Sequence, residues 1–456
     1  MPARRFASHH PLVAAVALAL GLGSAHAATI TVTSGGDAGS GSTCTLRQAI
    51  EAANTDAVVG SCAAGSGDDV IQFAGGLANS TITLAGTELA VSANLQIVGS
   101  GQTLDANDTS RVLNVADGVT LLASNLTVTG GQTAGSGGGI FVDRNASLTL
   151  SASTVTGNSA GDTGGGIYVG EYTQLTLTDS TVSNNVSTNG GGGIYGWGYN
   201  EFGLSGSTIS GNSTGNQGGG IYSWQSDLTM TNCTVTGNSV MDADSDGGGV
   251  WVVSETVANL RNSTISGNSA TGTGGGVFLS TNSSGIWENM ILSANTAADG
   301  VDLSRASNGG GKRPTHVAKR ASQAEPNGAI FAISASLLGT ALSGDFTGNG
   351  NVFNDVPGLG SLANNGGPTQ TLSLQAGSPA IDAGNNALIP PGVNFDQRGS
   401  GFSRVVGGTV DMGAFELAAV AAVEPTLIPA GSPWSLALLG GLLGLLGIVG
   451  LRSIRS

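Results

Sequence analysis

Aromatic side chains recur at a fixed spacing through the middle of the chain and are the first candidates for ligand binding. Each follows a glycine triplet and one aliphatic residue, and successive copies lie 27, 27, 27, 29 and 27 residues apart. The set comprises Phe141, Tyr168, Tyr195, Tyr222, Trp251 and Phe278. If the aliphatic residue faces the core, alternation along a strand turns the ring outward. Sugar C–H faces stack on exposed rings, so we predict that these residues form a glycan site. The alternative is that the rings pack inward as core or are covered by loops.

Three neighbouring aspartates are the second candidate, a calcium site. Asp242, Asp244 and Asp246 precede Gly247 in a D-x-D-x-D-G pattern that resembles the first half of a calcium loop. Carboxylate oxygens are the hard ligands that calcium prefers. The twelfth position holds Val253 instead of a bidentate glutamate, and this repeat is the lengthened one. A solvated acidic loop is therefore the alternative, and no other cofactor is expected.

The sequence contains no pattern that predicts catalysis. A glycoside hydrolase needs carboxylates converging within about 5–10 Å, which in a repetitive fold means acids at matching positions of adjacent repeats. Asp143, Asp162 and Asp179 have no such partner. A lyase needs a basic side chain beside calcium-binding carboxylates, yet residues 28–300 hold no lysine, and their four arginines lie outside acidic clusters. We predict no catalytic residue and favour a non-enzymatic protein.

The composition limits the classes of protein to which the chain could belong. Its 456 residues include 77 glycines, 39% hydrophobic and 10% charged residues, with a net charge of −15. The scarcity of lysine and arginine excludes a nucleic-acid partner bound through phosphate contacts. The apolar content excludes an acidic disordered chain, and the glycines lack the G-X-Y period of collagen. The class that remains is a β-protein with many short strands joined by tight turns.

A repeating unit over residues 125–296 predicts the fold. Its central sequence is Ser-Thr-Val-Thr-Gly-Asn or a close variant, and the clearest copies begin at Ser153, Ser180, Ser207, Cys233 and Ser263. A 27-residue period with strands of three to five residues leaves no room for a helix. Such units stack and pair strand to strand, whereas a propeller blade needs about 40–50 residues. We predict an all-β, right-handed parallel β-helix (a solenoid) with 27-residue coils.

Matching positions of the repeat form columns with structural roles. The Val or Ile of each copy, such as Val182, and the small residue two positions earlier face inward, so Cys233 is expected to be a buried, unreactive thiol. The asparagine that ends each copy forms a ladder of amides bonded from coil to coil. The ladder comprises Asn158, Asn185, Asn212, Asn238, Asn268 and Asn295. A polar ligand site is the alternative for this column.

The N-terminal region combines an export signal with a cap for the solenoid. Residues 1–27 carry two arginines, an apolar run and an Ala-His-Ala site before Ala28, which is the layout of a secretory signal peptide. Residues 44–54 form an amphipathic helix that would cap the first coil. Cys44 and Cys62 can pair as a disulfide in an oxidising compartment.

The C-terminal end predicts a membrane span. Residues 434–451 are uncharged and mostly apolar, long enough to cross a bilayer, and the arginines that follow would keep the end cytoplasmic. With the Pro-Thr-Leu motif at 425–427, this end resembles the IPTL-CTERM sorting tail of Gram-negative bacteria. The resemblance implies export, an inner-membrane tether through the C-terminal helix, and the inner-membrane sorting machinery as a partner. The final location would be the periplasm, the cell surface or the medium.

Two further motifs resemble those of secreted bacterial β-helix proteins. Residues 44–49, Cys-Thr-Leu-Arg-Gln-Ala, resemble the CSLREA motif near the start of such chains. The ordered strings at 362–371, 377–384, 396–399 and 410–416 resemble the choice-of-anchor Q domain. That resemblance implies a right-handed parallel β-helix body and no single enzymatic activity. The charged residues of these strings are expected to pair and close the last coils.

These observations divide the chain into seven parts and suggest a role. The parts are a signal peptide (1–27), an N-terminal cap (28–69), β-helix repeats (70–303), a basic loop insertion (304–328), a choice-of-anchor Q-like C-terminal part of the solenoid (329–417), a linker with the sorting motif (418–433) and a transmembrane sorting tail (434–456). We predict an exported, membrane-anchored or surface-displayed scaffold for adhesion or contact with an extracellular polysaccharide, without catalysis. The alternatives are a pectin-lyase-like polysaccharide lyase or glycoside hydrolase, and a purely structural envelope protein.

Overall fold

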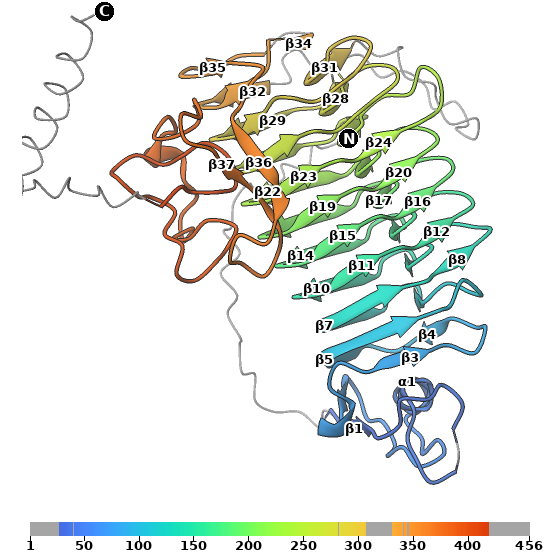
Figure 1. Cartoon of the computed structure of the whole chain (residues 1–456). Helices are drawn as coiled ribbons and strands as arrows, with labels where there is room; N and C mark the ends of the chain where they lie inside the picture. The colour runs from blue at the N-terminus through green and yellow to red at the C-terminus, as the bar shows by residue number, and fades with distance from the viewer. Residues whose placement is uncertain are drawn as a thin grey trace, which may run out of the picture. The chain divides into compact units, whose positions relative to one another are not determined.

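The computed structural model shows a solenoid of stacked β-strand coils with a helical cap at its N-terminal end (Figure 1). It describes residues 27–418 except residues 40, 281, 307–330, 341, 344 and 345. Strands of successive coils pair in parallel, so that Leu148 lies beside Leu175 and Val155 beside Val182, one 27-residue coil later. The predicted all-β parallel solenoid is therefore confirmed.

Two parallel ladders make up the main sheet, and the long strands β5 and β7 contribute to both. In the described residues this sheet comprises β1 (Thr29–Val32), β2 (Asp69–Phe73), β3 (Thr81–Thr83), β5 (Leu95–Asp105), β7 (Thr120–Thr129), β10 (Ser147–Ser151), β11 (Thr154–Thr156), β14 (Gln174–Thr178), β15 (Thr181–Ser183), β18 (Glu201–Ser205), β19 (Thr208–Ser210), β22 (Asp227–Thr231), β23 (Thr234–Thr236), β26 (Ala258–Arg261), β27 (Thr264–Ser266), β29 (Gly285–Glu288), β30 (Ile291–Leu292), β32 (Phe331–Ser334), β33 (Leu337–Leu338) and β35 (Val352–Phe353).

Two further parallel sheets close the coils. The first, called the aromatic sheet below, comprises β4 (Leu89–Val91), β6 (Leu113–Val115), β9 (Ile140–Val142), β13 (Ile167–Val169), β17 (Ile194–Trp197), β21 (Ile221–Trp224), β25 (Val250–Val253), β28 (Val277–Ser280), β31 (Leu303–Ala306) and β34 (Leu342–Ser343). The second comprises β8 (Gln132–Thr133), β12 (Ser159–Ala160), β16 (Val186–Ser187), β20 (Ser213–Thr214) and β24 (Ser239–Val240).

Aliphatic side chains from the main and aromatic sheets fill the interior. Val155, Val182 and Ile209 stack in one inward column and are at most 1% exposed. Glycine is required where the coils approach one another: a Cβ on Gly139 would lie 2.7 Å from the carbonyl oxygen of Gly166 in the next coil. The glycine triplets thus allow close stacking that a larger residue would prevent.

The asparagine column forms a buried ladder of hydrogen bonds. The Asn158 side chain donates to the Asn185 side chain at 2.9 Å, and the same bond repeats through Asn212, Asn238, Asn268 and Asn295. The Asn295 amide then donates to Asp302 Oδ1 at 2.8 Å. Asp302 thus ends the ladder with a carboxyl group, and burial raises the pKa of this group. The ladder satisfies polar groups that the close stacking would otherwise leave unpaired.

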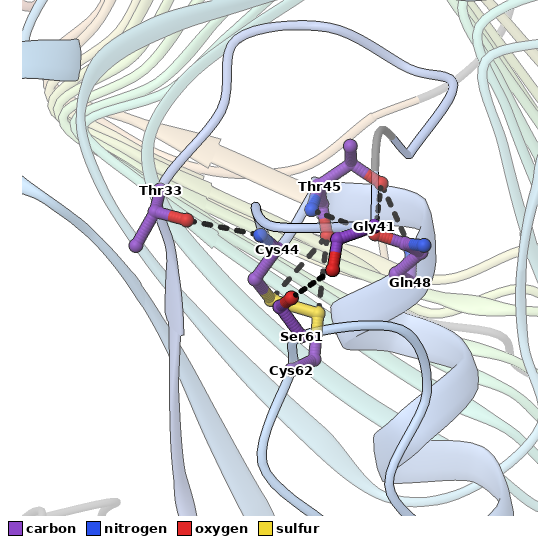
Figure 2. Close-up of a disulfide and its surroundings, with 7 residues drawn as sticks. All are labelled: Thr33, Gly41, Cys44, Thr45, Gln48, Ser61 and Cys62. Atoms are coloured by element: carbon purple, nitrogen blue, oxygen red, sulfur yellow. Dashed lines mark hydrogen bonds between the residues drawn. A yellow bond between two sulfur atoms is a disulfide. The ribbon is translucent and has the colours of Figure 1, made fainter.

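The N-terminal cap is built around one short helix and the predicted disulfide. Helix α1 (Leu46–Thr55) begins at a capping box in which Thr45 and Gln48 bond each other's backbone N–H groups. Cys44 and Cys62 form the disulfide beside this capping box, which confirms the predicted pairing (Figure 2). The short 3₁₀-helix η1 (Gly75–Leu77) follows β2. The thiol of Cys233 is buried, and burial raises its pKa to about 12.

The C-terminal part differs from the prediction that residues 329–417 continue the solenoid. Strands β32 to β35 do extend the coils, but residues 354–417, called the fold-back segment below, return along the main sheet (Figure 1). This segment contains the antiparallel pair β36 (Leu359–Ala363) and β37 (Thr371–Leu374) and the 3₁₀-helix η2 (Asn386–Leu388). Gln397 bonds the hydroxyls of Thr208 and Thr234, so polar threonines on the outer face of the main sheet hold the segment.

The prediction of an inner-membrane tether through a C-terminal helix is corrected by the structure. In the described part of the chain, no helix has the length and apolar character needed to cross a membrane. Helix α1 has 10 residues and is about 15 Å long, whereas the hydrocarbon core of a bilayer is about 30 Å thick. The predicted span at 434–451, residues 1–26 of the predicted signal peptide (1–27) and most of the basic loop (307–328) lie outside the described residues.

Candidate functional site

The predicted aromatic residues form one continuous stack on the outer side of the aromatic sheet. Strand pairing places Tyr168 between Phe141 and Tyr195, and the later rings follow in register. Neighbouring rings are nearly parallel, with centroids 4.3 Å apart for Tyr195 and Tyr222 and 4.4 Å apart for Tyr222 and Trp251. The rings therefore point outward from the coils, as predicted, and they pack face to face along the solenoid.

The same stacking corrects the expectation of an exposed aromatic stripe. Tyr195, Tyr222, Trp251 and Phe278 are 1–6% exposed and form a small apolar cluster of their own. Each ring covers the faces of its neighbours, and the guanidinium of Arg111 covers Phe141 at 4.9 Å. Burial raises the pKa of both Tyr195 and Tyr222. Because a sugar needs a free ring face for stacking, this column supports the coils and offers little binding surface.

Exposed aromatic surface lies instead at the turn between the aromatic sheet and the main sheet. Tyr172 and Tyr199 occupy equivalent positions of adjacent coils, and their ring centroids are 5.2 Å apart. Their side chains are 58% and 55% exposed. Both residues have left-handed backbone conformations, with φ of 59° and 56°. Asn145 and Gln225 adopt the same conformation in neighbouring coils, so it belongs to the repeated turn, which holds both rings at its outer side.

Carboxylates surround a hollow beside Tyr199. The hollow has a volume of about 260 Å³, and we call it the tyrosine–carboxylate hollow; it is lined by Tyr199, Asn200, Glu201, Gln225, Asp227, Ser254 and Glu255. Glu201 and Asp227 are the first residues of β18 and β22 and are direct partners in strand register. Partial burial raises the pKa of Asp227, the Val257 N–H opposes this effect, and the charge of Glu201 adds to it. The hollow therefore combines an aromatic ring with two adjacent carboxyl groups.

The pair formed by Glu201 and Asp227 was missed in the sequence because the coil that separates them is one residue short. The two residues are 26 positions apart, so they do not align at the 27-residue period of the repeat. The turn between the sheets absorbs the deletion, so the strands return to register at β18 and β22. An alignment anchored on the strands themselves would have found the pair.

The aspartates of the predicted calcium loop do not converge. Asp242 and Asp244 are exposed, whereas Asp246 is buried and accepts hydrogen bonds from the backbone and hydroxyl of Thr273 at 2.8 and 3.1 Å. Across the described residues, no group of three or more acidic, histidine or cysteine side chains could hold a metal ion.

Comparisons with known proteins found one family model and one solved structure to report. The family model described as "Right handed beta helix region" matches residues 138–312. The fold is a right-handed parallel β-helix. A solved pectate lyase, Pel9A, is similar to this β-helix with a TM-score of 0.46 and 14% identity, over 86% of this chain and 97% of that chain. A search of curated proteins gave no match.

Proposed function

We propose that this β-helix protein binds a neutral polysaccharide at the tyrosine–carboxylate hollow without cleaving it. The observation that carries the proposal is the stacked, exposed pair Tyr172 and Tyr199 beside aligned carboxylates. A glycan chain could stack on the rings while its hydroxyl groups donate hydrogen bonds to Glu201 and Asp227. Sites of this kind combine apolar surface with a few polar groups that fix orientation.

The charge of the site favours a neutral chain over an acidic one. Glu201, Asp227 and Glu255 line the hollow, and the whole chain carries a net charge of −15. A polysaccharide of uronic acids would meet repulsion from these carboxylates. Hydroxyl groups of a neutral sugar instead supply the donors that ionised carboxylates accept. Soluble glucans, mannans and xylans are therefore the ligand classes to test.

Replacing both exposed tyrosines should remove binding. We expect Tyr172→Ala with Tyr199→Ala to weaken retention in affinity electrophoresis, with the neutral polysaccharide in the gel, by about tenfold or more, because exposed aromatic anchors dominate binding energies. Phe353→Ala is the matched control, since Phe353 is also 55% exposed but lies in β35. Equal retention of the double variant and the control would contradict the proposed site.

A second candidate function, glycoside hydrolysis, is favoured by the pairing of Glu201 and Asp227. Retaining hydrolases hold two carboxyl groups about 5–5.5 Å apart, one of them protonated as the acid. The raised pKa of Asp227 suits it to the acid role, and Glu201 would act as the nucleophile. If the wild-type protein shortens a polysaccharide, Glu201→Gln and Asp227→Asn should each lower the rate at least about 100-fold and leave retention intact. Undiminished cleavage in both variants would exclude this mechanism.

A further inference from the structure

A buried carboxylate at the start of the solenoid lacks a cationic partner. Asp69, the first residue of β2, is 0% exposed. Its Oδ1 accepts hydrogen bonds from the backbone N–H groups of Ser66 at 2.8 Å and Ala28 at 3.0 Å. Its Oδ2 has no hydrogen-bond partner, and Asp69 is absent from every ion pair found among the described residues. A buried, uncompensated carboxylate is costly.

Two neighbours of the Asp69 carboxylate are defined by the structure, and one of them is the Ala28 nitrogen. On one side the carboxylate packs against the backbone: a Cβ on Gly65 would lie 2.3 Å from Asp69 Oδ2 and 2.7 Å from the Ala52 carbonyl oxygen. On the other side the carboxylate meets the backbone nitrogen of Ala28. The Ala28 carbonyl also accepts from Val70 N–H at 2.8 Å, so this nitrogen is held in place just before β1.

Ala28 is also the residue that the sequence places directly after the signal-peptide cleavage site, Ala-His-Ala at 25–27. Ala27 is exposed, whereas the chain becomes buried within three residues, at Ile30. The bond between Ala27 and Ala28 therefore lies at the boundary between accessible chain and the folded first coil.

We propose that Asp69 is the receptor for the α-ammonium group of Ala28, which is created when a signal peptidase cuts the Ala27–Ala28 bond. In this hydrolysis the C–N bond breaks and water supplies a hydroxyl to the Ala27 carbonyl carbon and a proton to the Ala28 nitrogen. The new amine takes up a further proton at neutral pH. One N–H donor becomes three, together with a positive charge, so the ammonium can satisfy both oxygens of Asp69.

The proposal links processing to the stability of the cap. Before cleavage, Asp69 is a buried charge held by neutral N–H donors; after cleavage it belongs to an ion pair with charge-assisted hydrogen bonds, which are shorter and stronger. The pair joins β1 to β2 at the first coil, next to helix α1 and the disulfide. The mature chain should therefore hold its N-terminal edge more firmly than the precursor does.

The test compares the exported full-length chain with a variant that has one alanine inserted between Ala27 and Ala28. Cleavage after residue 27 leaves the insertion variant with an amide at Ala28 and its ammonium one residue away. We expect intact mass to show Ala28 as the first residue of the wild-type protein. Its melting temperature should exceed that of the insertion variant by about 2 °C or more, and Asp69→Asn should abolish this difference.

A chemical readout keeps the proposal testable if Asp69→Asn does not fold. The α-amine of the native wild-type chain should be acylated at least about tenfold more slowly than that of the insertion variant, because a contacting carboxylate favours the charged form of an amine. Peptide mass spectrometry separates this amine from the lysines. Any other first residue, or equal acylation and equal melting temperatures in the two chains, would overturn the proposal.

Discussion

The Val182→Asp variant should lose the cooperative folded state of the solenoid. Val182 is 1% exposed and stacks between Val155 and Ile209 in the inward column of the main sheet. An aspartate there would bury a charge among aliphatic side chains with no partner in reach. We expect the free energy of unfolding to fall by about 4 kcal/mol or more. Urea unfolding followed by far-UV circular dichroism measures this loss.

The matched control for this variant is Val186→Asp. Val186 lies in β16 of the same coil but is 42% exposed, so the same substitution leaves the new charge in water. The free energy of unfolding of the control should lie within about 0.5 kcal/mol of the wild-type value, as is usual for surface substitutions. Equal unfolding midpoints for the two variants would show that the inward column is assigned wrongly.

The Arg404→Met variant should loosen the fold-back segment, because the partners of Arg404 all lie within that segment. The Arg404 guanidinium bonds Glu416 Oε2 at 3.0 Å and the Gly413 carbonyl at 2.9 Å, and both charged side chains are 1% exposed. Removing one partner of a buried ion pair typically costs about 3–5 kcal/mol, because the other charge stays buried. Limited proteolysis should therefore cut residues 354–417 at lower urea concentrations than in the wild type.

The loss caused by Arg404→Met should depend on pH. Burial already raises the pKa of Glu416 to about 7, and the charge of Arg404 opposes that rise. Without Arg404 the pKa rises further, so protonated Glu416 is neutral at pH 5 and charged only at higher pH. The difference in stability between variant and wild type should then be smaller at pH 5 than at pH 8. Arg144→Met, at an exposed position, is the control and should show no such trend.

The repeat predicted the solenoid because local sequence and long-range pairing obey one period. Val155, Val182 and Ile209 recur at 27 residues, and the structure pairs them directly and buries all three. The fold-back segment was not predictable in the same way. It is attached by an apolar cluster that joins Met412 and Phe415 to Ile291, and by hydrogen bonds such as that from Thr234 to Gln397, 163 residues away. Neither kind of contact follows the period of the repeat.

The candidate site was only partly predictable for a related reason. Alternation along a strand gives the direction of Tyr195 and Tyr222 but not their exposure, since rings from adjacent coils cover each other. Tyr172 and Tyr199 lie in a turn, where no simple alternation applies, and the aligned pair of Glu201 and Asp227 is hidden by a coil that is one residue short. The candidate site therefore combines tyrosines of the turns with carboxylates at the starts of two strands.

The most direct test of the central claim is to incubate the purified protein with neutral and acidic polysaccharides and to measure retention and chain length in the same samples. The account predicts retention by at least one neutral polysaccharide, no shortening of its chains, and weaker retention by polyuronates. Shortened chains would replace the binding function with hydrolysis at Glu201 and Asp227. Absence of retention on every neutral polysaccharide would contradict the glycan site and leave a structural envelope protein as the interpretation.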